Sequence, residues 1–248
     1  MLDDIKIVLC QTSHPGNIGA AARAMKTMGL SKLVLFNPKT FPSEDAYARA
    51  SGAIDILDKA QVVSSIEEAL KGCKLIIGTS SRNRALPWPL IEPREMAQII
   101  SEKSDARPVA IVFGREDTGL LNDELKLCHY HVNIPANPNY MSLNLASAVQ
   151  VIAYELKLAE VSNHHDSSDN SLKDSEQAAT FEDVNGLYEH LESMMIKTEF
   201  FDPNNPKLLP VRIRRLFAKA QLNQGEVNIL RGFLSSIDKH IQRNINQK

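Results

Sequence analysis

Three segments of the chain combine residue types that could hold a polar ligand and move a proton. The first contains Asn17 and Arg23, an amide and a guanidinium six residues apart. The guanidinium could bind a phosphate through two hydrogen bonds or polarise a hydroxyl. A solvated arginine on a helix would show the same spacing. If the segment is helical, both side chains could lie near one side of its first turns, which makes them candidates for a catalytic site.

The second segment, residues 114–120, follows the most apolar run of the chain. Gly114 and Gly119 could sit where a Cβ would obstruct the backbone. Glu116 could act as an acid or a base, or it could cap the helix that follows. The segment is not a Walker A loop and contains no dinucleotide-binding G-x-G-x-x-G fingerprint. By itself it is typical of a structural turn.

The third segment, residues 134–149, is a constrained turn between a strand and a buried helix. Pro135 and Pro138 each fix φ and remove a backbone donor. Ser142 and Asn144 stand where the helix begins, among its unpaired N–H groups. We expect such a turn to hold backbone groups rigidly for a ligand.

A further polar loop follows another strand. Thr79, Ser80 and Ser81 place three hydroxyls at the carboxyl end of that strand, where open α/β sheets bind small ligands. Arg82 and Arg84 could add phosphate contacts. An ordinary polar surface loop explains the same residues equally well.

The pattern of histidines and cysteines argues against a metal site. His129 and His131 alternate along one strand, but no third ligand has a suitable spacing. Cys10, Cys73 and Cys128 are far apart and form no CxxC, which is typical of reduced, buried cysteines in a cytosolic protein. No signal peptide and no membrane-spanning apolar run is evident.

Alternating strands and helices must position these loops. Apolar runs predict strands at residues 5–10, 33–36, 62–63, 75–78, 109–113 and 130–134. Helical periodicity and caps predict helices at residues 17–29, 43–53, 66–72, 92–102 and 142–160. Continuous apolar strands between helices indicate an α/β fold, a parallel sheet with helices on both faces, spanning residues 1–160.

The remainder of the chain differs in composition. Residues 161–180 are polar and predict a flexible linker, and residues 181–248 predict a small domain of three amphipathic helices. Residues 207–248 hold nine Lys or Arg against two Asp or Glu, a net charge of +7, although the whole chain carries −2. The apolar face of the middle helix is predicted to contain Leu209, Ile213, Leu216 and Phe217. A solvated helix face is the alternative, but this concentration of charge favours contact with a polyanion.

Together the segments resemble the three motifs of the SPOUT superfamily of RNA methyltransferases. The matching sequences are Asn17-x-Gly-x-x-x-Arg23, Phe113-Gly-Arg-Glu-x-x-Gly-Leu120 and Ile134-Pro followed by Ser142-Leu-Asn-Leu-Ala-x-Ala148. The residues around Asn17, the sequence Pro87-Trp-Pro89 and the basic helical tail are similar to a bacterial group of transfer RNA (tRNA) ribose methyltransferases within that superfamily.

The resemblance implies a C-terminal trefoil knot in the α/β domain and a cytoplasmic homodimer whose active site borders the partner. It also implies that S-adenosyl-L-methionine is the cofactor and that no metal takes part. The residues expected to bind the cofactor are Thr79, Ser80, Ser81, Gly114, Glu116, Gly119, Ile134, Met141, Ser142 and Leu143.

The implied chemistry is methylation of a ribose 2′-hydroxyl in the anticodon stem-loop of tRNA, at cytidine or uridine 32. Arg23 would orient the ribose and its phosphate and help to remove the proton, with Asn17 and Asn144 fixing Arg23 or the substrate. Because arginine is a poor base, a route assisted by phosphate or by Ser142 stays open. The residues expected to contact RNA are Arg82, Arg84, Arg115, Arg212, Arg214, Arg215 and Lys219.

Two other functions stay open at this stage. A non-catalytic RNA-binding protein could retain the same fold. An enzyme acting on a small molecule with a different nucleotide cofactor could share the strand-and-loop pattern.

Overall fold

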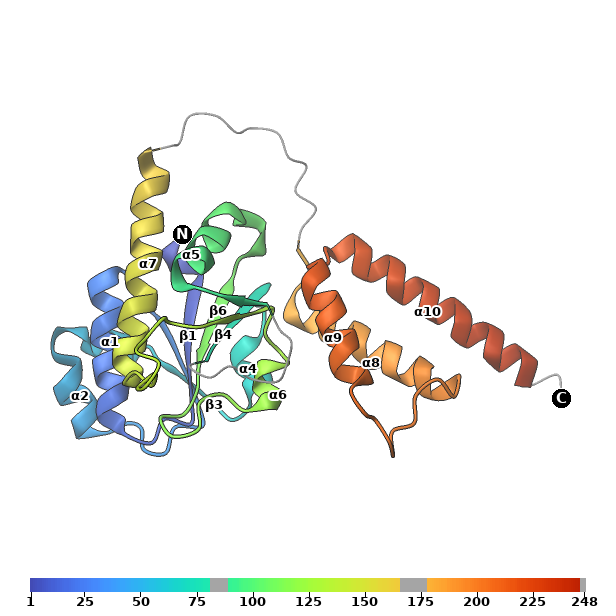
Figure 1. The fold of residues 1–248 in the computed structure, drawn as a ribbon, viewed down its shortest axis with the longest axis horizontal. Helices are drawn as coiled ribbons and strands as arrows, with labels where there is room; N and C mark the ends of the chain where they lie inside the picture. The colour runs from blue at the N-terminus through green and yellow to red at the C-terminus, as the bar shows by residue number, and fades with distance from the viewer. Residues whose placement is uncertain (81–88, 166–177, 246–248) are drawn as a thin grey trace. The chain divides into compact units, whose positions relative to one another are not determined.

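The computed structural model describes residues 1–80, 89–165 and 178–245 (Figure 1). Three residues of predicted functional interest, Ser81, Arg82 and Arg84, lie outside these ranges, as does most of the predicted linker. The chain divides into two compact units, Met1–Lys173 and Asp174–Lys248. The predicted boundaries at 160 and 180 stay predictions, and the helix before the linker continues to His165.

The first unit is built on a seven-stranded sheet in which every described pairing is parallel. The strand order is β3-β2-β1-β6-β4-β7-β5. The strands are β1 (Ile5–Cys10), β2 (Lys32–Phe36), β3 (Gln61–Val63), β4 (Leu75–Thr79), β5 (Leu90–Ile91), β6 (Val109–Phe113) and β7 (Tyr130–Val132). The predicted parallel α/β architecture is therefore confirmed.

Both faces of the sheet are covered by helices, which explains why its strands are apolar on both sides. On one face, Ile5, Ile7 and Leu9 of β1 belong to a core that also contains buried side chains from five helices of this unit. Val8 and Cys10 alternate with them along the strand and are also fully buried. The helices of the unit are α1 (Pro15–Met28), α2 (Glu44–Ala50), α3 (Ile54–Asp58), α4 (Ile66–Leu70), α5 (Pro93–Glu102), α6 (Asn122–Leu125) and α7 (Leu145–His165).

Helix α1 begins two residues earlier than the sequence predicts. His14 precedes the helix in an extended conformation, and Pro15 occupies its first position. Proline suits that position because its missing N–H would have no partner there and its φ is already helical. Asn17, predicted as the cap, therefore lies inside the first turn. At Gly19 a Cβ would overlap the backbone of Ala46, so a glycine there lets α1 and α2 pack closely.

The strand order places the ends of β4, β6 and β7 side by side, since β4 pairs with both of the others. Parallel strands end at the same edge of the sheet, so the loops after these three strands converge. The trefoil knot stays a prediction.

The second unit contains the three predicted helices, α8 (Phe181–Lys197), α9 (Leu209–Ala220) and α10 (Gln224–Ile245). The Thr180 side chain accepts a hydrogen bond from the Asp183 N–H, and the Asp183 carboxylate accepts one from the Thr180 N–H. This reciprocal cap fixes the start of α8. Leu187, Val227 and Leu234 are buried in the core between α8 and α10.

Candidate active site

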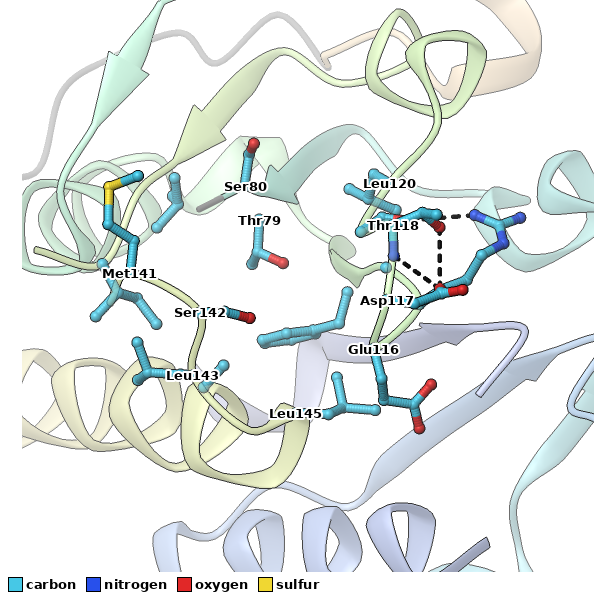
Figure 2. Close-up of a pocket in the computed structure, with 17 residues that line it drawn as sticks. Thr79, Ser80, Glu116, Asp117, Thr118, Leu120, Met141, Ser142, Leu143 and Leu145 are labelled. Carbon is cyan, nitrogen blue, oxygen red and sulfur yellow. Dashed lines mark hydrogen bonds between the residues drawn. The ribbon is translucent and has the colours of Figure 1, made fainter. Parts of the chain in front are cut away.

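A pocket opens where the loops after β4, β6 and β7 meet the start of α7 (Figure 2). It encloses about 830 Å³ of space that protein atoms do not fill, partly open to solvent. Its lining is Thr79, Ser80, Phe113, Gly114, Arg115, Glu116, Asp117, Thr118, Gly119, Leu120, Val132, Ile134, Met141, Ser142, Leu143, Leu145 and Ala148. Nine of the ten residues predicted to bind a cofactor are in this set, and the tenth, Ser81, lies outside the described residues. Their role as ligands stays a prediction.

The loop between β6 and α6 is a tight backbone turn. The Arg115 N–H donates to the Gly119 carbonyl at 3.2 Å, and the Gly119 N–H donates back to Arg115 at 2.9 Å. A Cβ at Gly114 would overlap the backbone of Gly119 and Leu120, and Gly119 has a φ of +70°. Both positions therefore require glycine, because any side chain would open the turn that forms one wall of the pocket.

Glu116 links this loop to the start of α1. Its Oε2 accepts hydrogen bonds from the Ser13 N–H at 3.0 Å and the Ser13 hydroxyl at 2.9 Å. Its Oε1 accepts from the His14 N–H at 3.2 Å and from Asn17 Nδ2 at 2.9 Å. In Figure 2 the Glu116 carboxylate lies at the opposite side of the pocket from Met141. Through these four hydrogen bonds Glu116 holds the loop after β6 against the segment that leads into α1.

These hydrogen bonds keep Glu116 ionised. Burial raises the pKa of its carboxyl, but the hydrogen bonds from Ser13, Asn17 and His14 outweigh burial and lower the pKa to about 2. A carboxylic acid with this pKa holds no proton near neutral pH. The structure therefore favours a positioning role for Glu116 over the role of general acid or base.

Asn17 extends the same chain of hydrogen bonds to the third segment. Its Oδ1 accepts from Asn144 Nδ2 at 3.0 Å, and Asn144 Oδ1 accepts from the Ala146 N–H at 2.9 Å. Asn144 thereby caps the first turn of α7. The network Glu116–Asn17–Asn144 thus joins all three sequence motifs beside a single pocket, although Asn17 is 99 residues from Glu116 and 127 residues from Asn144 in the chain.

Ser142 and Thr79 supply hydroxyls to the interior of the pocket. In Figure 2 both side chains point into the space between the converging loops. The Thr79 hydroxyl donates to the Val112 carbonyl at 3.1 Å, which fixes its rotamer. The apolar side chains of Phe113, Leu143 and Leu145 line the same space. A pocket with this mixture suits a ligand that has a flat apolar part and several polar groups.

Arg23 lies apart from this pocket. It is exposed on α1, and the lining of the pocket does not include it. Six residues of α-helix turn through about 240° beyond one full turn, so Asn17 and Arg23 point in different directions from the helix axis. The expectation that both lie near one side of the helix is wrong. Asn17 faces the Glu116 network, whereas Arg23 faces solvent.

The guanidinium of Arg115, predicted to contact RNA, is used inside the protein. Its two terminal nitrogens donate to the Glu124 carboxylate at 3.0 and 2.9 Å, and its Nε donates to Gln11 at 2.9 Å. Both side chains of the ion pair are largely buried. The Glu124 carboxylate raises the pKa of Arg115 further, against the effect of burial. Arg115 therefore stabilises the loop, and the prediction that it contacts RNA is corrected.

Helix α9 separates its basic residues onto two faces. The Arg214 guanidinium lies 4.5 Å from the centre of the Tyr188 ring of α8, and the Tyr188 hydroxyl donates to the Arg214 carbonyl. Arg214 is thus half-buried and packed against α8, and its contact with RNA stays a prediction. Arg212 and Lys219 are exposed, and their spacing of seven residues places them on one side of the helix.

The exposed face of α9 also contains an apolar residue. Leu216 is 63% exposed, whereas Ile213 and Phe217 of the predicted apolar face are half-buried. Arg215 is half-buried, and its Nε has no hydrogen-bond partner among the described residues.

Other polar and titratable groups of the first unit have structural partners. His129 Nδ1 accepts from the Ile76 N–H at 3.0 Å, and burial lowers its pKa to about 4. His131 Nε2 lies 3.1 Å from the Leu125 carbonyl. Within the described ranges no group of three or more His, Cys, Asp or Glu could hold a metal ion, and no helix is long and apolar enough to cross a membrane. The three cysteines are buried, as the sequence predicts, and none forms a disulfide within the described residues.

Sequence reasoning missed part of the site. Ser13 and His14 hold Glu116, and Asp117 and Thr118 form the outer part of the pocket wall. No signal in the sequence connects residues 13 and 14 to a carboxylate about a hundred residues later. The acidic and hydroxyl side chains at 117 and 118 looked like ordinary turn residues.

Comparison with known proteins places this geometry in a family. Residues 4–154 match the family model described as the SpoU rRNA Methylase family, and residues 182–246 match that of the tRNA methyltransferase TrmJ C-terminal domain. The chain belongs to the SpoU methylase family. The parallel sheet and the converging loops lie within the residues matched by the first model, and the C-terminal helical unit contains the residues matched by the second.

Relatives of known name cover almost the whole chain. The tRNA (cytidine/uridine-2′-O-)-methyltransferase TrmJ of Pectobacterium atrosepticum is 49% identical over 245 residues, covering 96% of this chain and 98% of the relative. The tRNA (cytidine/uridine/adenosine-2′-O-)-methyltransferase TrmJ of Pseudomonas aeruginosa is also 49% identical, covering 96% and 95%. The crystal structure of TrmJ from Z. mobilis has a TM-score of 0.82 and 34% identity, and covers 94% of this chain and 98% of that one.

Proposed function

We propose that this protein is an S-adenosyl-L-methionine-dependent tRNA methyltransferase that methylates the ribose 2′-oxygen of cytidine or uridine 32 in the anticodon loop. The observation that carries the proposal is the Glu116–Asn17–Asn144 network, which holds the three motifs of a SpoU methylase around one pocket. Similarity to TrmJ relatives over 96% of the chain supports tRNA as the substrate. Nucleotide 32 is the position implied by the resemblance of the three motifs to the SPOUT RNA methyltransferases.

The residues of the pocket fit the cofactor. S-adenosyl-L-methionine combines a flat adenine with a ribose and an amino-acid tail, and it supplies a methyl group on a positively charged sulfur. Phe113, Leu143 and Leu145 offer apolar surface for a flat ring, while the backbone of residues 114–119 and the Thr79 hydroxyl offer polar contacts. No charged side chain needs to titrate for such binding.

The protein contributes to the reaction mainly by positioning. Methyl transfer to a hydroxyl requires the acceptor oxygen in line with the bond that breaks, so holding the reactants in place accounts for much of the rate. Ser142 lines the pocket, and its hydroxyl would relay the proton of the ribose 2′-hydroxyl to a neighbouring phosphate or to water. Arg23 faces solvent away from the pocket of its own chain, and in the proposed homodimer it would bind the phosphate beside a ribose held at the partner's pocket. The Asn17–Asn144 pair keeps the start of α1 beside the pocket.

The positions of the basic residues agree with an RNA that extends beyond the pocket. Arg23 is exposed on the first unit, and Arg212 and Lys219 are exposed on α9. Phosphates contacted by such residues would supply affinity that depends on salt. The second unit thus serves as an additional RNA-binding element.

A homodimer is part of the proposal. Tyr154, Leu158 and Val161 recur at helical spacing along α7 and are all exposed in the single chain. A second copy covering this stripe would remove it from water. Sedimentation velocity tests this: the expected species has twice the 27.6 kDa mass of the chain, and a monomer at micromolar concentration would contradict it.

The enzymatic proposal is tested by transfer of labelled methyl groups from S-adenosyl-L-methionine to unmodified tRNA. We expect Arg23→Ala to lose at least about 100-fold in rate, as general acid–base and positioning groups do, while it binds S-adenosylhomocysteine normally. Arg49→Ala removes another exposed arginine, from α2, and serves as the matched control. Tight tRNA binding by the wild type without any transfer would favour a non-catalytic RNA-binding protein.

A further inference from the structure

The turn between β7 and α7 holds an aromatic side chain outside the pocket. The Tyr140 N–H donates to the Asn137 carbonyl at 2.8 Å, and the Asn139 N–H donates to Asn137 Oδ1 at 3.0 Å. Pro138, within the turn, has a fixed φ. These constraints define the backbone position of Tyr140, although the whole stretch 135–142 is exposed.

The Tyr140 side chain itself is 78% exposed, the highest value among the large hydrophobic side chains described as exposed. No hydrogen bond of its hydroxyl occurs within the described residues. An ordered turn that presents an aromatic ring to water gains nothing for the fold of this chain. Such rings in RNA-binding proteins commonly provide a surface on which an unpaired base stacks.

The location of the ring relative to the pocket limits which base it could meet. Tyr140 is followed directly by Met141 and Ser142, which line the pocket. Two residues of extended chain span at most about 7 Å, so Tyr140 lies within one nucleotide of Ser142. A ribose presented at Ser142 would have its own base within reach of the Tyr140 ring.

We propose that Tyr140 is a positioning residue that stacks on the base of the nucleotide whose ribose is methylated. This inference rests on the proposed function. Stacking holds the nucleotide out of its loop and fixes the sugar at the pocket without reading the edges of the base. The names of the relatives, which include cytidine and uridine and in one case adenosine, fit a contact that tolerates any base.

Two substitutions separate stacking from other contributions. Tyr140→Phe keeps the ring and loses the hydroxyl, whereas Tyr140→Leu keeps apolar bulk and loses the ring. On unmodified tRNA we expect Tyr140→Phe to stay within about 2-fold of the wild-type kcat/KM and Tyr140→Leu to fall about 10- to 100-fold, as loss of one base stack would predict. Thermal unfolding and the Kd for S-adenosylhomocysteine should be unchanged in both variants.

A second readout detects the stack directly. In an anticodon stem-loop RNA with 2-aminopurine at the target nucleotide, the wild type and Tyr140→Phe should quench fluorescence on binding, and Tyr140→Leu should not. Equal kcat/KM and equal quenching in Tyr140→Leu and the wild type would overturn the inference while leaving the enzyme assignment intact. Loss of S-adenosylhomocysteine binding in Tyr140→Leu would also overturn it, because the residue would then act on the pocket. Absence of methyl transfer by the wild type would refute the proposed function, and this inference with it.

Discussion

Replacing Glu116 by glutamine tests whether one carboxylate holds the site together. The carboxylate accepts four hydrogen bonds from Ser13, His14 and Asn17. In the glutamine variant the amide NH₂ group would face some of these hydrogen-bond donors and could not accept from them. A fall in pKa from 4.5 to about 2 corresponds to at most about 3 kcal/mol of stabilisation. Because the side chain is partly exposed, solvent screening reduces this to ~1–2 kcal/mol.

We therefore expect Glu116→Gln to lower the free energy of unfolding by about 1–2 kcal/mol near neutral pH, measured by urea unfolding of the full chain. Asp117→Asn is the matched control, since Asp117 belongs to the same loop but its carboxylate bonds to the adjacent Thr118. This control should change stability by less than about 0.5 kcal/mol.

The pH dependence of the same difference gives a sharper test. The folded-state pKa of Glu116 is lowered, so its contribution is fully present above pH 4.5 and is lost as the pH falls from 4.5 toward about 2. The stability difference between the wild type and Glu116→Gln should be constant from pH 8 to about pH 5.5 and should shrink below pH 4.5. A difference no larger than that of Asp117→Asn, or one independent of pH down to the acid limit of folding, would refute the reasoning.

Three other variants probe the remaining electrostatic features. Arg115→Met leaves Glu124 buried without its partner and should destabilise the protein by about 3–5 kcal/mol. The salt dependence of RNA binding should not change in this variant. A flatter salt dependence would indicate that Arg115 does contact RNA. His129→Asn keeps an acceptor for the strand N–H but does not titrate. Burial lowers the pKa of His129 from 6.5 to about 4, so the free energy of unfolding of the wild type should decline by up to about 3 kcal/mol as the pH falls through that interval. Urea unfolding of the variant should not show that decline. Parallel pH profiles of the two proteins would contradict this. The double variant Arg212→Gln with Lys219→Gln should flatten the slope of log K against log salt for tRNA by about 1.5, as filter binding would measure, and an unchanged slope would exclude that face of α9.

The strands and the order of the loops could be predicted from the sequence because they depend on local composition. A run such as residues 109–113 is entirely apolar and lies between turn residues, so its assignment to a buried strand needs no knowledge of its neighbours. The strand Leu90–Ile91 escaped prediction. Two residues are too few to show a periodicity, and this strand forms through its pairing with β7.

The site could be predicted as a set of loops, but the use of individual side chains could not. Arg115 and Arg214 are of the residue type that commonly binds RNA. Arg115, however, is paired with the carboxylate of Glu124, nine residues away, and Arg214 lies on the aromatic ring of Tyr188 in a different helix. These partners are decided by packing, which leaves no mark in the spacing of charges. Glu116 illustrates the opposite case, since a residue with two possible chemical roles proved to join α1 to the pocket.

The start of α1 could have been predicted from Pro15, but the capping residue Asn17 suggested a later start. Asn17 is a good capping residue, but Pro15 two positions earlier is an equally good first residue of a helix. The structure follows the proline, and the asparagine is thereby free to donate to Glu116 and to accept from Asn144. The displaced cap is thus one reason why the three motifs meet.

Nucleoside mass spectrometry of unmodified tRNA incubated with the protein and S-adenosyl-L-methionine tests the central claim most directly. The account predicts one methyl group per tRNA, on the ribose 2′-oxygen of cytidine or uridine 32, with transfer abolished in Arg23→Ala. Methylation on a base, or an unmodified tRNA after incubation with a folded protein that binds the cofactor, would contradict it.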